Sequence, residues 1–370
     1  MSFHKVAHLT SVHLRYDTRI FLKECISLAK VGFEVYLVVA DGLGSEIKEG
    51  VKIEDVGRKT GGRLSRITKT MALIFKKARS LNADIYHLHD PELIPVGLKL
   101  KKMGKKVIFD AHEDLPKQIL SKHYLGKMAR RILSKILEWY ERKSCKKLDA
   151  IVAATPYIRD KFFKIHKNTI DVCNYPILGE LLVSQTDYTK KQKHVCYIGG
   201  IGEARGIKQM VKAMEFIETP AHLLLGGSFS EKKVYDEVKL YPGWLKVEDQ
   251  GWLNREEIKK VFESSLAGLV TLHPIINYLD SLPVKMFEYM SAGLPVISSD
   301  FSLWKEIIEG NDCGLCVNPL DPQAIAKAID FLVLNQERAR QMGENGRKAV
   351  IEKYNWAIEE KKLLKLYESL

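Results

Sequence analysis

A single carboxylate, Glu288, lies in an apolar, helix-forming segment with breaks at both ends. The segment follows Pro283 and ends at Gly293, directly before another apolar run. A carboxylate can accept two hydrogen bonds from a vicinal diol such as a ribose. The start of a helix can face a phosphate. The pattern therefore predicts a diol-binding edge beside a phosphate, and the plainer alternative is a solvated surface glutamate.

A glycine-rich turn follows a predicted strand in the same half of the chain. It reads Gly199-Gly-Ile-Gly-Glu-Ala-Arg-Gly206. Gly200 and Gly202 let the backbone approach a phosphate closely, Arg205 can pair with a diphosphate, and Lys208 lies one turn further on. The spacing is not that of a dinucleotide fingerprint, and no acidic residue follows a second strand, which argues against an NAD site. The alternative is a tight turn with a solvated arginine.

Histidines follow two predicted strands in the first half of the chain. His112 lies in Phe109-Asp-Ala-His-Glu-Asp-Leu-Pro116, and we expect it at the crevice where ligands of α/β proteins bind. A structural histidine is the alternative. His87 and His89 alternate along one strand, so we expect them on opposite faces. With no third ligand at a matching position, the sequence predicts no metal site.

The loop after the first predicted strand is polar and lacks a glycine phosphate loop. It carries His13, Arg15, Asp17 and Arg19. These side chains could line one side of a binding site for an anionic donor or for an acceptor. Asp17 also has a plainer role, as the cap of the helix that follows.

Strands and helices alternate through both halves of the chain, which predicts an α/β protein. Repeated units of this kind form parallel, doubly wound sheets. Predicted strands cover residues 6–10, 34–40, 84–89, 106–110 and 149–155, then 195–200, 221–227, 266–272 and 294–298. The polar stretch 179–193 is the predicted linker. We therefore expect two Rossmann-like domains, residues 1–178 and 190–352, facing a ligand-binding cleft, with a final helix over 353–370 that packs back on the first domain.

Composition places the chain among globular proteins. It has 370 residues, 46% of them hydrophobic, and no apolar run near the roughly 20 residues that span a membrane. The start has no signal-peptide layout. Six scattered cysteines imply no disulfide framework, and we expect Cys313 and Cys316 to be buried in a strand. A cytoplasmic protein is the expectation.

Positive charge is concentrated in the first half. Residues 1–180 hold 34 Lys and Arg against 20 Asp and Glu, a net charge of +14, which leaves −2 for residues 181–370. Residues 117–147 alone hold ten basic residues. Apolar residues recur there at helical spacing, at 125, 128, 132, 133, 136, 137 and 140. This predicts either a helix on an anionic membrane surface or a core-packed helix with a solvated basic face, and no specific nucleic-acid binding.

The ordered motifs resemble those of retaining glycosyltransferases of family 4, with the GT-B fold, such as enzymes of bacterial surface-polysaccharide and O-antigen assembly. The resemblance covers nearly the whole chain. Its carriers are Asp17-Thr-Arg-Ile-Phe-Leu-Lys-Glu24, His89-Asp-Pro-Glu-Leu93, Asp110-Ala-His-Glu113, Asn174-Tyr-Pro176, the glycine turn, Phe287-Glu-Tyr-Met-Ser-Ala-Gly-Leu-Pro-Val296 and Tyr354-Asn-Trp356.

The resemblance implies roles for the donor-side residues. Glu288 matches the ribose-binding second acid of the Glu-x7-Glu pattern, and Asp280 stands eight positions upstream, where the family usually has Glu. Arg205 matches a cation that holds the donor diphosphate. The family's second cation is replaced here by Gly200, and Lys208 or Lys285 are the candidates to compensate.

Two further positions follow from the same resemblance. His112 matches a histidine that lines the donor sugar, and Trp252 lies in a segment that touches the nucleotide base. The resemblance implies metal-independent transfer of a sugar from a nucleoside diphosphate to a hydroxyl acceptor, without a cofactor. The basic first half suggests a lipid-linked acceptor. Alternatives are a nucleotide-sugar 2-epimerase of the same fold and a non-catalytic nucleotide-sugar-binding subunit.

Overall fold

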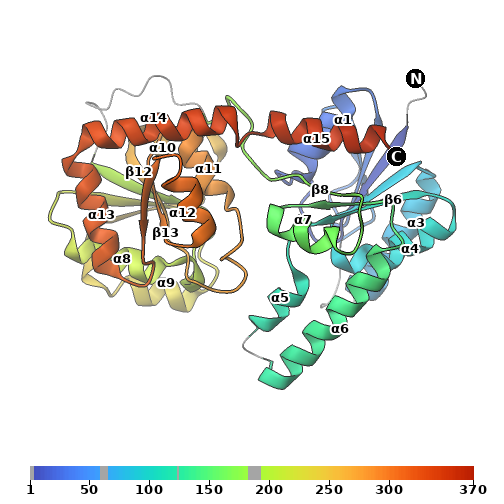
Figure 1. Ribbon diagram of the computed structural model, residues 1–370, viewed down its shortest axis with the longest axis horizontal. Coiled ribbons are helices and arrows are strands. Elements are labelled where there is room, and N and C mark those ends of the chain that lie inside the picture. The colour runs from blue at the N-terminus through green and yellow to red at the C-terminus, as the bar shows by residue number, and fades with distance from the viewer. Residues whose placement is uncertain (1–3, 59–65, 123–124, 182–192) are drawn as a thin grey trace. The chain divides into compact units, whose positions relative to one another are not determined.

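The computed structural model describes residues 4–58, 66–122, 125–181 and 193–370 (Figure 1). The chain divides into two compact units. Unit 1 comprises Met1–Asn174 together with Ile358–Leu370, and unit 2 comprises Tyr175–Ala357. The chain therefore returns to unit 1 within its last helix.

Unit 1 is built on an eight-stranded sheet with the order β3-β4-β2-β1-β5-β6-β7-β8. Every neighbouring pair is parallel except β3 and β4. The strands are β1 (Lys5–Leu9), β2 (Glu34–Val39), β3 (Glu46–Lys48), β4 (Val51–Asp55), β5 (Ile85–Leu88), β6 (Lys106–Ala111), β7 (Ala150–Ala153) and β8 (Thr169–Asp171).

Helices cover both faces of this sheet, so its central strands are buried except at their first residues, Lys5 in β1 and Lys106 in β6. The helices are η1 (Ile20–Cys25) continuing into α1 (Ile26–Lys30), η2 (Arg66–Thr70) continuing into α3 (Met71–Leu81), η3 (Pro91–Leu93) continuing into α4 (Ile94–Lys102), α5 (Leu115–Leu120), α6 (Lys127–Cys145), α7 (Pro156–Phe163) and α15 (Trp356–Glu368). Alternate residues of β1 point to opposite faces. Ala7 and Leu9 join the core under α3 and α4, whereas His8 faces Tyr367 of α15.

Unit 2 is a second doubly wound unit with the sheet order β11-β10-β9-β12-β13-β14, all parallel. Its strands are β9 (His194–Ile198), β10 (His222–Gly226), β11 (Val247–Gly251), β12 (Ser265–Val270), β13 (Val296–Ser299) and β14 (Gly314–Val317). Its helices are η4 (Glu203–Arg205), α8 (Ile207–Phe216), α9 (Lys232–Val238), η5 (Pro242–Lys246), α10 (Arg255–Ser264), α11 (Val284–Ser291), α12 (Ser302–Ile308), α13 (Pro322–Leu334) and α14 (Gln336–Glu352). The predicted α/β class with two Rossmann-like units is confirmed.

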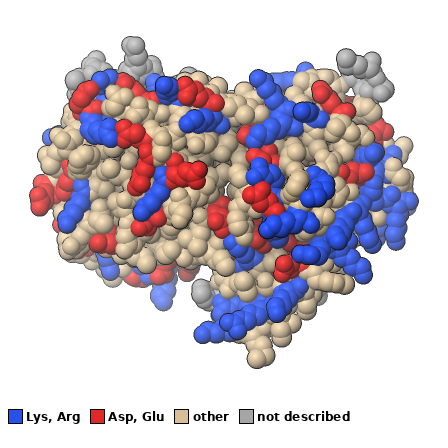
Figure 2. Space-filling model, in the orientation of Figure 1, with Lys and Arg blue, Asp and Glu red and all other residues tan. Residues whose placement is uncertain are grey.

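The basic helix α6 exposes most of its apolar residues. Met128 is 77% exposed, Trp139 is 60% exposed, and Ile132 and Ile136 are each 54% exposed. Lys and Arg gather along the same helix (Figure 2). Anchoring comes from a few contacts, including a hydrogen bond from Ser134 Oγ to the carbonyl of Pro116 at 2.9 Å. In the part of the chain that the structure describes, no helix is both long and apolar enough to cross a membrane.

Candidate functional site

Two glycine turns meet backbone to backbone at the carboxyl end of β9 and β10 in unit 2. Gly199 has φ +127° and Gly227 has φ +143°, conformations that favour glycine. A Cβ added to Gly227 would overlap the carbonyl oxygen of Gly199. The Gly199 amide donates to the carbonyl of Gly226 at 2.9 Å. The sequence thus forms an open backbone turn at the position where α/β proteins bind ligands.

Two cationic side chains flank this turn. Lys285 Nζ lies 3.1 Å from where a Cβ of Gly199 would stand and 3.5 Å from the centre of the Tyr197 ring. This buried ammonium has no hydrogen-bond partner among the described residues. Arg205 donates from Nη1 to the carbonyl of Gly200 at 3.3 Å. Burial lowers the pKa of Lys285 well below its usual value, and Arg205 lowers it further. The turn is therefore a cationic site suited to an anion.

The remaining predicted residues of the glycine turn have structural partners. Gly206, with φ +82°, begins α8, and a Cβ there would overlap the carbonyl oxygen of Thr271. Gly202 is extended, and a Cβ there would lie 2.8 Å from Ser230 Oγ. Lys208 forms ion pairs with Glu203 at 3.2 Å and Glu237 at 3.0 Å, so its charge is already neutralised.

Glu288 lies on α11, one turn after Lys285, and its carboxylate is half buried. Its Oε1 accepts from Arg255 Nη1 at 2.7 Å, and Arg255 also pairs with Glu180 at 2.7 Å. The neighbouring Tyr289 hydroxyl accepts from the Ile198 amide at 2.9 Å, which fixes α11 against the end of β9. Through that contact the helix holds Glu288 and Lys285 near the glycine turn.

Two predicted donor residues lie outside the immediate glycine turn. Asp280 is half buried in the segment between β12 and α11. Trp252 directly follows β11 and is 74% exposed. In unit 2 the structure therefore gathers Gly199, Gly200, Arg205 and Lys285 at one turn, with Glu288 close by on the same helix as Lys285.

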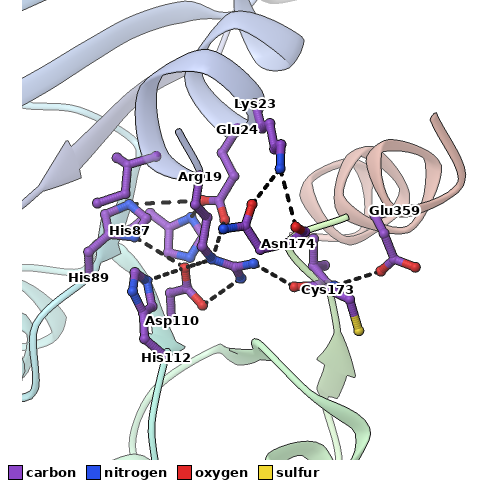
Figure 3. A network of polar contacts seen from close by, with 12 residues as sticks. Arg19, Lys23, Glu24, His87, His89, Asp110, His112, Cys173, Asn174 and Glu359 are labelled. Atoms are coloured by element: carbon purple, nitrogen blue, oxygen red, sulfur yellow. Dashed lines mark hydrogen bonds and ion pairs between the residues drawn. The ribbon is translucent and has the colours of Figure 1, made fainter. Parts of the chain in front are cut away.

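Asp110, at the end of β6, is the centre of a buried network in unit 1 (Figure 3). Arg19 donates to both its oxygens, at 2.9 and 2.8 Å. His112 Nε2 lies 2.8 Å from Oδ2, and His89 Nδ1 lies 3.2 Å from the same atom. Burial acts to raise the pKa of Asp110, but Arg19 and His112 outweigh it and hold the pKa well below its usual range. The network holds His112 in a defined orientation.

The predicted loop residues of unit 1 join this network. The His13 ring lies 5.0 Å from the His112 ring, and its Nδ1 lies 3.3 Å from Asp17 Oδ2. Asp17 Oδ1 also accepts from the backbone amides of Arg19 and Ile20, so it caps the helix start. The structure therefore brings together His13, Asp17, Arg19 and His112, which the sequence offered from two separate segments.

The prediction that His87 and His89 lie on opposite faces is wrong. Their ring centroids are 4.7 Å apart. The expectation misapplied strand periodicity, because residues two apart in an extended chain point to the same face, and His89 directly after β5 keeps this direction. His8, Glu24 and Tyr367 also meet these rings and were missed, since each comes from a distant segment. Only the motif Lys23-Glu24 within the family resemblance offered a signal.

Burial strongly perturbs these groups. It raises the pKa of Glu24 well above its usual value, with a further contribution from Asp110. It lowers the pKa of His8 and His87 well below the usual value, and that of His89 to about 4 despite the opposing effect of Asp110. At neutral pH the three imidazoles are therefore uncharged.

Comparison with known families assigns both units. Residues 19–173 match the family described as Glycosyltransferase Family 4, and residues 182–349 match Glycosyl transferases group 1. The chain is a family 4 glycosyltransferase. The resemblance read from the motifs is thus confirmed, and so is the prediction of an enzyme.

This glycosyltransferase is similar to known proteins over much of its length. It is 24% identical over 64% of the chain to the alpha-maltose-1-phosphate synthase of Mycolicibacterium smegmatis, and spans 67% of that protein. It spans only 45% of an uncharacterized glycosyltransferase of Methanocaldococcus jannaschii, to which it is 26% identical over 48% of this chain.

Solved structures support the GT-B fold. Sucrose-phosphate synthase from Thermosynechococcus elongatus superposes with a TM-score of 0.79 at 18% identity, over 99% of this chain and 98% of that one. Anabaena HepE in complex with UDP-glucose has a TM-score of 0.74 at 14% identity, over 99% of this chain and 100% of that one. GT-B enzymes typically transfer sugars without a metal ion.

Proposed function

We propose that this glycosyltransferase moves a sugar, with retention of anomeric configuration, from a nucleoside diphosphate sugar to a hydroxyl acceptor. One observation carries the proposal: the buried ammonium of Lys285, without a hydrogen-bond partner among the described residues, beside the Gly199–Gly200 turn. A buried, unpaired charge is costly. A diphosphate at the turn would neutralise it. The UDP-glucose complex of the similar HepE supports this class of donor.

Lys285 supplies the second cation that the Gly200 position lacks. Its ammonium reaches the glycine turn from α11, whereas Arg205 approaches from the turn itself. As the bond to the sugar breaks, negative charge develops on the departing phosphate. Arg205, Lys285 and the amides at the start of α8 would stabilise that charge without reorganising. In this scheme the leaving phosphate also helps to deprotonate the acceptor hydroxyl.

Other residues have positioning roles in the proposal. Arg255 donates to Oε1 of Glu288, so Oε2 is left for the ligand. In the proposal, Oε2 accepts hydrogen bonds from the ribose hydroxyls. His112, held by Asp110, would contact the transferred sugar, with Asp280 near it and Trp252 beside the base. His13, Asp17 and Arg19 remain candidates for the acceptor side.

The acceptor we propose is a lipid-linked glycan in cell-surface polysaccharide assembly. The support is α6, whose exposed Met128, Ile132, Ile136 and Trp139 share a helix with six Lys and Arg. Such a helix can lie in the interface of an anionic membrane, with apolar side chains inserted and cations on headgroups. We propose that the enzyme works at the inner face of the cell membrane as a peripheral protein.

Two experiments test these proposals. A thermal-shift panel of UDP-, GDP-, ADP- and CMP-sugars should give a shift with one nucleotide, and Glu288→Ala should lose it. No shift with any of the four would count against the donor site. Incubation without an acceptor separates transfer from epimerisation, because an epimerase converts the donor alone.

The membrane proposal is tested by cosedimentation with liposomes. Wild type should sediment with anionic vesicles, and the double variant Ile132→Ser with Trp139→Ser should not. The matched control is Phe331→Ser on α13, an exposed aromatic residue of the other unit. Wild type that stays in the supernatant with anionic vesicles would refute membrane binding through α6.

A further inference from the structure

Four buried side chains from separate segments of unit 1 converge on one point, and Figure 3 shows three of them, Glu24, His87 and His89. They are His8 of β1, Glu24 of η1, His87 of β5 and His89 just after it, and each side chain is fully buried. Glu24 Oε2 lies 3.9 Å from His8 Nδ1, 3.7 Å from His87 Nδ1 and 3.9 Å from His89 Nε2. One ligand atom from each of the four lies within 4.8 Å of all the others.

Glu24 is unusual within this group. Neither carboxylate oxygen has a hydrogen-bond partner among the described residues. Arg19 Nε lies 3.1 Å from Oε1, but its N–H is directed at Asp110 Oδ2, 2.9 Å away. A buried polar group without a partner is rare, and a bound ion is one of its ordinary explanations. Oε2 therefore faces three imidazole nitrogens, of which His8 Nδ1 and His89 Nε2 share a hydrogen bond at 2.8 Å and His87 Nδ1 contacts the Tyr367 hydroxyl.

We propose that His8, Glu24, His87 and His89 bind one divalent transition metal ion, with zinc the best match. Three imidazoles and one carboxylate form a ligand set that zinc accepts. Tetrahedral zinc with bonds of about 2.05 Å needs ligand atoms about 3.3 Å apart. The distance between His8 Nδ1 and His89 Nε2 is 2.8 Å and those from Glu24 Oε2 reach 3.9 Å. The hydrogen bond between the two histidines would give way to the ion, and the distances would change by about 0.5–0.6 Å to reach that spacing.

The outer contacts suit a metal site. Zinc-bound histidines usually donate their second ring N–H to a carboxylate or another oxygen. His89 Nδ1 faces Asp110 Oδ2 at 3.2 Å, and His8 Nε2 faces the Tyr367 hydroxyl at 3.3 Å. Tyr367 also contacts His87 Nδ1 at 2.8 Å, and that contact would give way to the ion. Two of the three histidines thus already have oriented partners.

Two other clusters with metal-ligand side chains are less suitable. Asp110, which joins His89 and His112, is already bound on both oxygens by the Arg19 guanidinium. Asp171 and Glu359, which join Cys173, share the Lys362 ammonium at 2.8 and 2.9 Å. A metal ion at either cluster would have to displace the Arg19 guanidinium or the Lys362 ammonium, or bind beside it against electrostatic repulsion. At Glu24 Oε2 the neighbours are imidazoles, which bind metals when uncharged.

The ion would have a structural and positioning role. Four protein ligands leave no open coordination position, which is the arrangement of structural rather than catalytic zinc. It would join β1, η1 and β5, and through His89 and Asp110 it would steady His112. This inference does not depend on the proposed sugar transfer, and the donor-binding turn of unit 2 contains none of its ligands.

The first experiment measures metal in protein purified without a histidine tag. Inductively coupled plasma mass spectrometry should find about one zinc per chain in wild type. Glu24→Gln and His87→Gln should each lower the content to about a tenth or less. His222→Gln in unit 2 is the matched control and should keep it. Wild type with less than about a tenth of an equivalent would overturn the proposal, as would equal metal in Glu24→Gln and wild type.

A second measurement on wild type decides the question if those variants do not fold. Because the site is fully buried, the metal is removed with a chelator in denaturant and the chain is refolded with or without Co²⁺ or Zn²⁺. We expect the strong visible absorption of tetrahedral Co²⁺ without thiolate charge-transfer bands, and a melting temperature about 5 °C or more above that of the metal-free chain. Thiolate bands, weak octahedral absorption or an unchanged melting temperature would overturn the proposal.

Discussion

Each unit buries an ionisable group on a helix that packs beside its sheet, and one group is basic whereas the other is acidic. In unit 2 it is the ammonium of Lys285, and in unit 1 it is the carboxylate of Glu24. Neither group has a hydrogen-bond partner among the described residues, although Arg19 Nε lies 3.1 Å from Glu24 Oε1. Burial lowers the pKa of Lys285 and raises that of Glu24, so it favours the neutral form of each group, and a ligand of the opposite charge would restore the charged form. The comparison leads to an anion at the glycine turn and a cation at the histidine cluster.

Charged residues near these two groups have partners of their own and therefore do not indicate a ligand. Arg19 and Asp110 are equally buried but form a two-pronged ion pair, so neither needs a ligand. Lys208 lies one turn beyond the glycine turn but pairs with two glutamates. Burial together with the absence of a partner, rather than charge alone, separates ligand-binding candidates from structural ion pairs.

The largest expected effect on stability comes from breaking the buried ion pair between Arg19 and Asp110. Arg19→Met leaves Asp110 and Glu24 without their cation in a buried site, and we expect unfolding free energy to fall by about 3–5 kcal/mol. Urea denaturation of the purified protein measures it. Arg338→Met, which removes a half-exposed partner of Asp312, should leave the midpoint nearly unchanged. Equal midpoints for wild type and Arg19→Met would mean that the buried pair adds nothing to stability.

The second-largest effect on stability is expected at the contact between the backbones of Gly227 and Gly199, which shapes the anion site. Gly227→Ala forces a Cβ into the carbonyl of Gly199, so the glycine turn must move. We expect a loss of about 2–3 kcal/mol in stability together with weaker donor binding. Gly104→Ala is the control, because Gly104 also has positive φ but open space at its Cβ. Identical donor affinities in the two variants would show that the turn geometry is unimportant.

Lys285→Met separates ligand binding from folding. Losing a charge-assisted contact should weaken donor binding about 10- to 100-fold, as measured by isothermal titration calorimetry. The folded protein should become no less stable at neutral pH, since the buried charge is removed together with its desolvation cost. A loss of stability equal to the loss of affinity would mark Lys285 as a purely structural residue.

The pH dependence of this variant has a defined sign. Burial and Arg205 lower the pKa of Lys285 in the folded state, while Glu288 and Cys196 oppose them. The unfolded chain therefore binds more protons between that lowered value and 10.5, so wild-type stability gains with rising pH. The stability advantage of Lys285→Met should be largest at low pH and disappear as the pH reaches 10.5.

The smallest effect is expected at the neutralised lysine. Lys208→Met should change donor affinity by about twofold or less, because Glu203 and Glu237 already balance its charge. The same calorimetric titration measures it. A tenfold loss would mean that Lys208 leaves its glutamates when the donor binds, and it would remove the contrast with Lys285.

Sequence reasoning predicted the framework well where strands are apolar. The central strands β1, β5, β9 and β12 were expected within two residues of their observed ends. The edge strands β3, β8 and β11 were not predicted, whereas a strand was expected around Cys313 and Cys316, where the edge strand β14 lies. β11 reads Val-Glu-Asp-Gln-Gly and β3 reads Glu-Ile-Lys, so neither has the apolar run that identifies a buried strand. At a sheet edge, pairing with one neighbour replaces burial as the source of stability.

The chain by itself determined the α/β architecture, the glycine turn and the family, because each depends on local spacing or on an ordered set of motifs. It also named His112, Arg205 and Lys285 as candidates. Only the tertiary structure decided which charges have partners. His8, Glu24, His87 and Tyr367 are up to 359 positions apart, and only the sheet order and α15 bring them together. Whether a buried charge is satisfied depends on such distant contacts, and no local pattern encodes them.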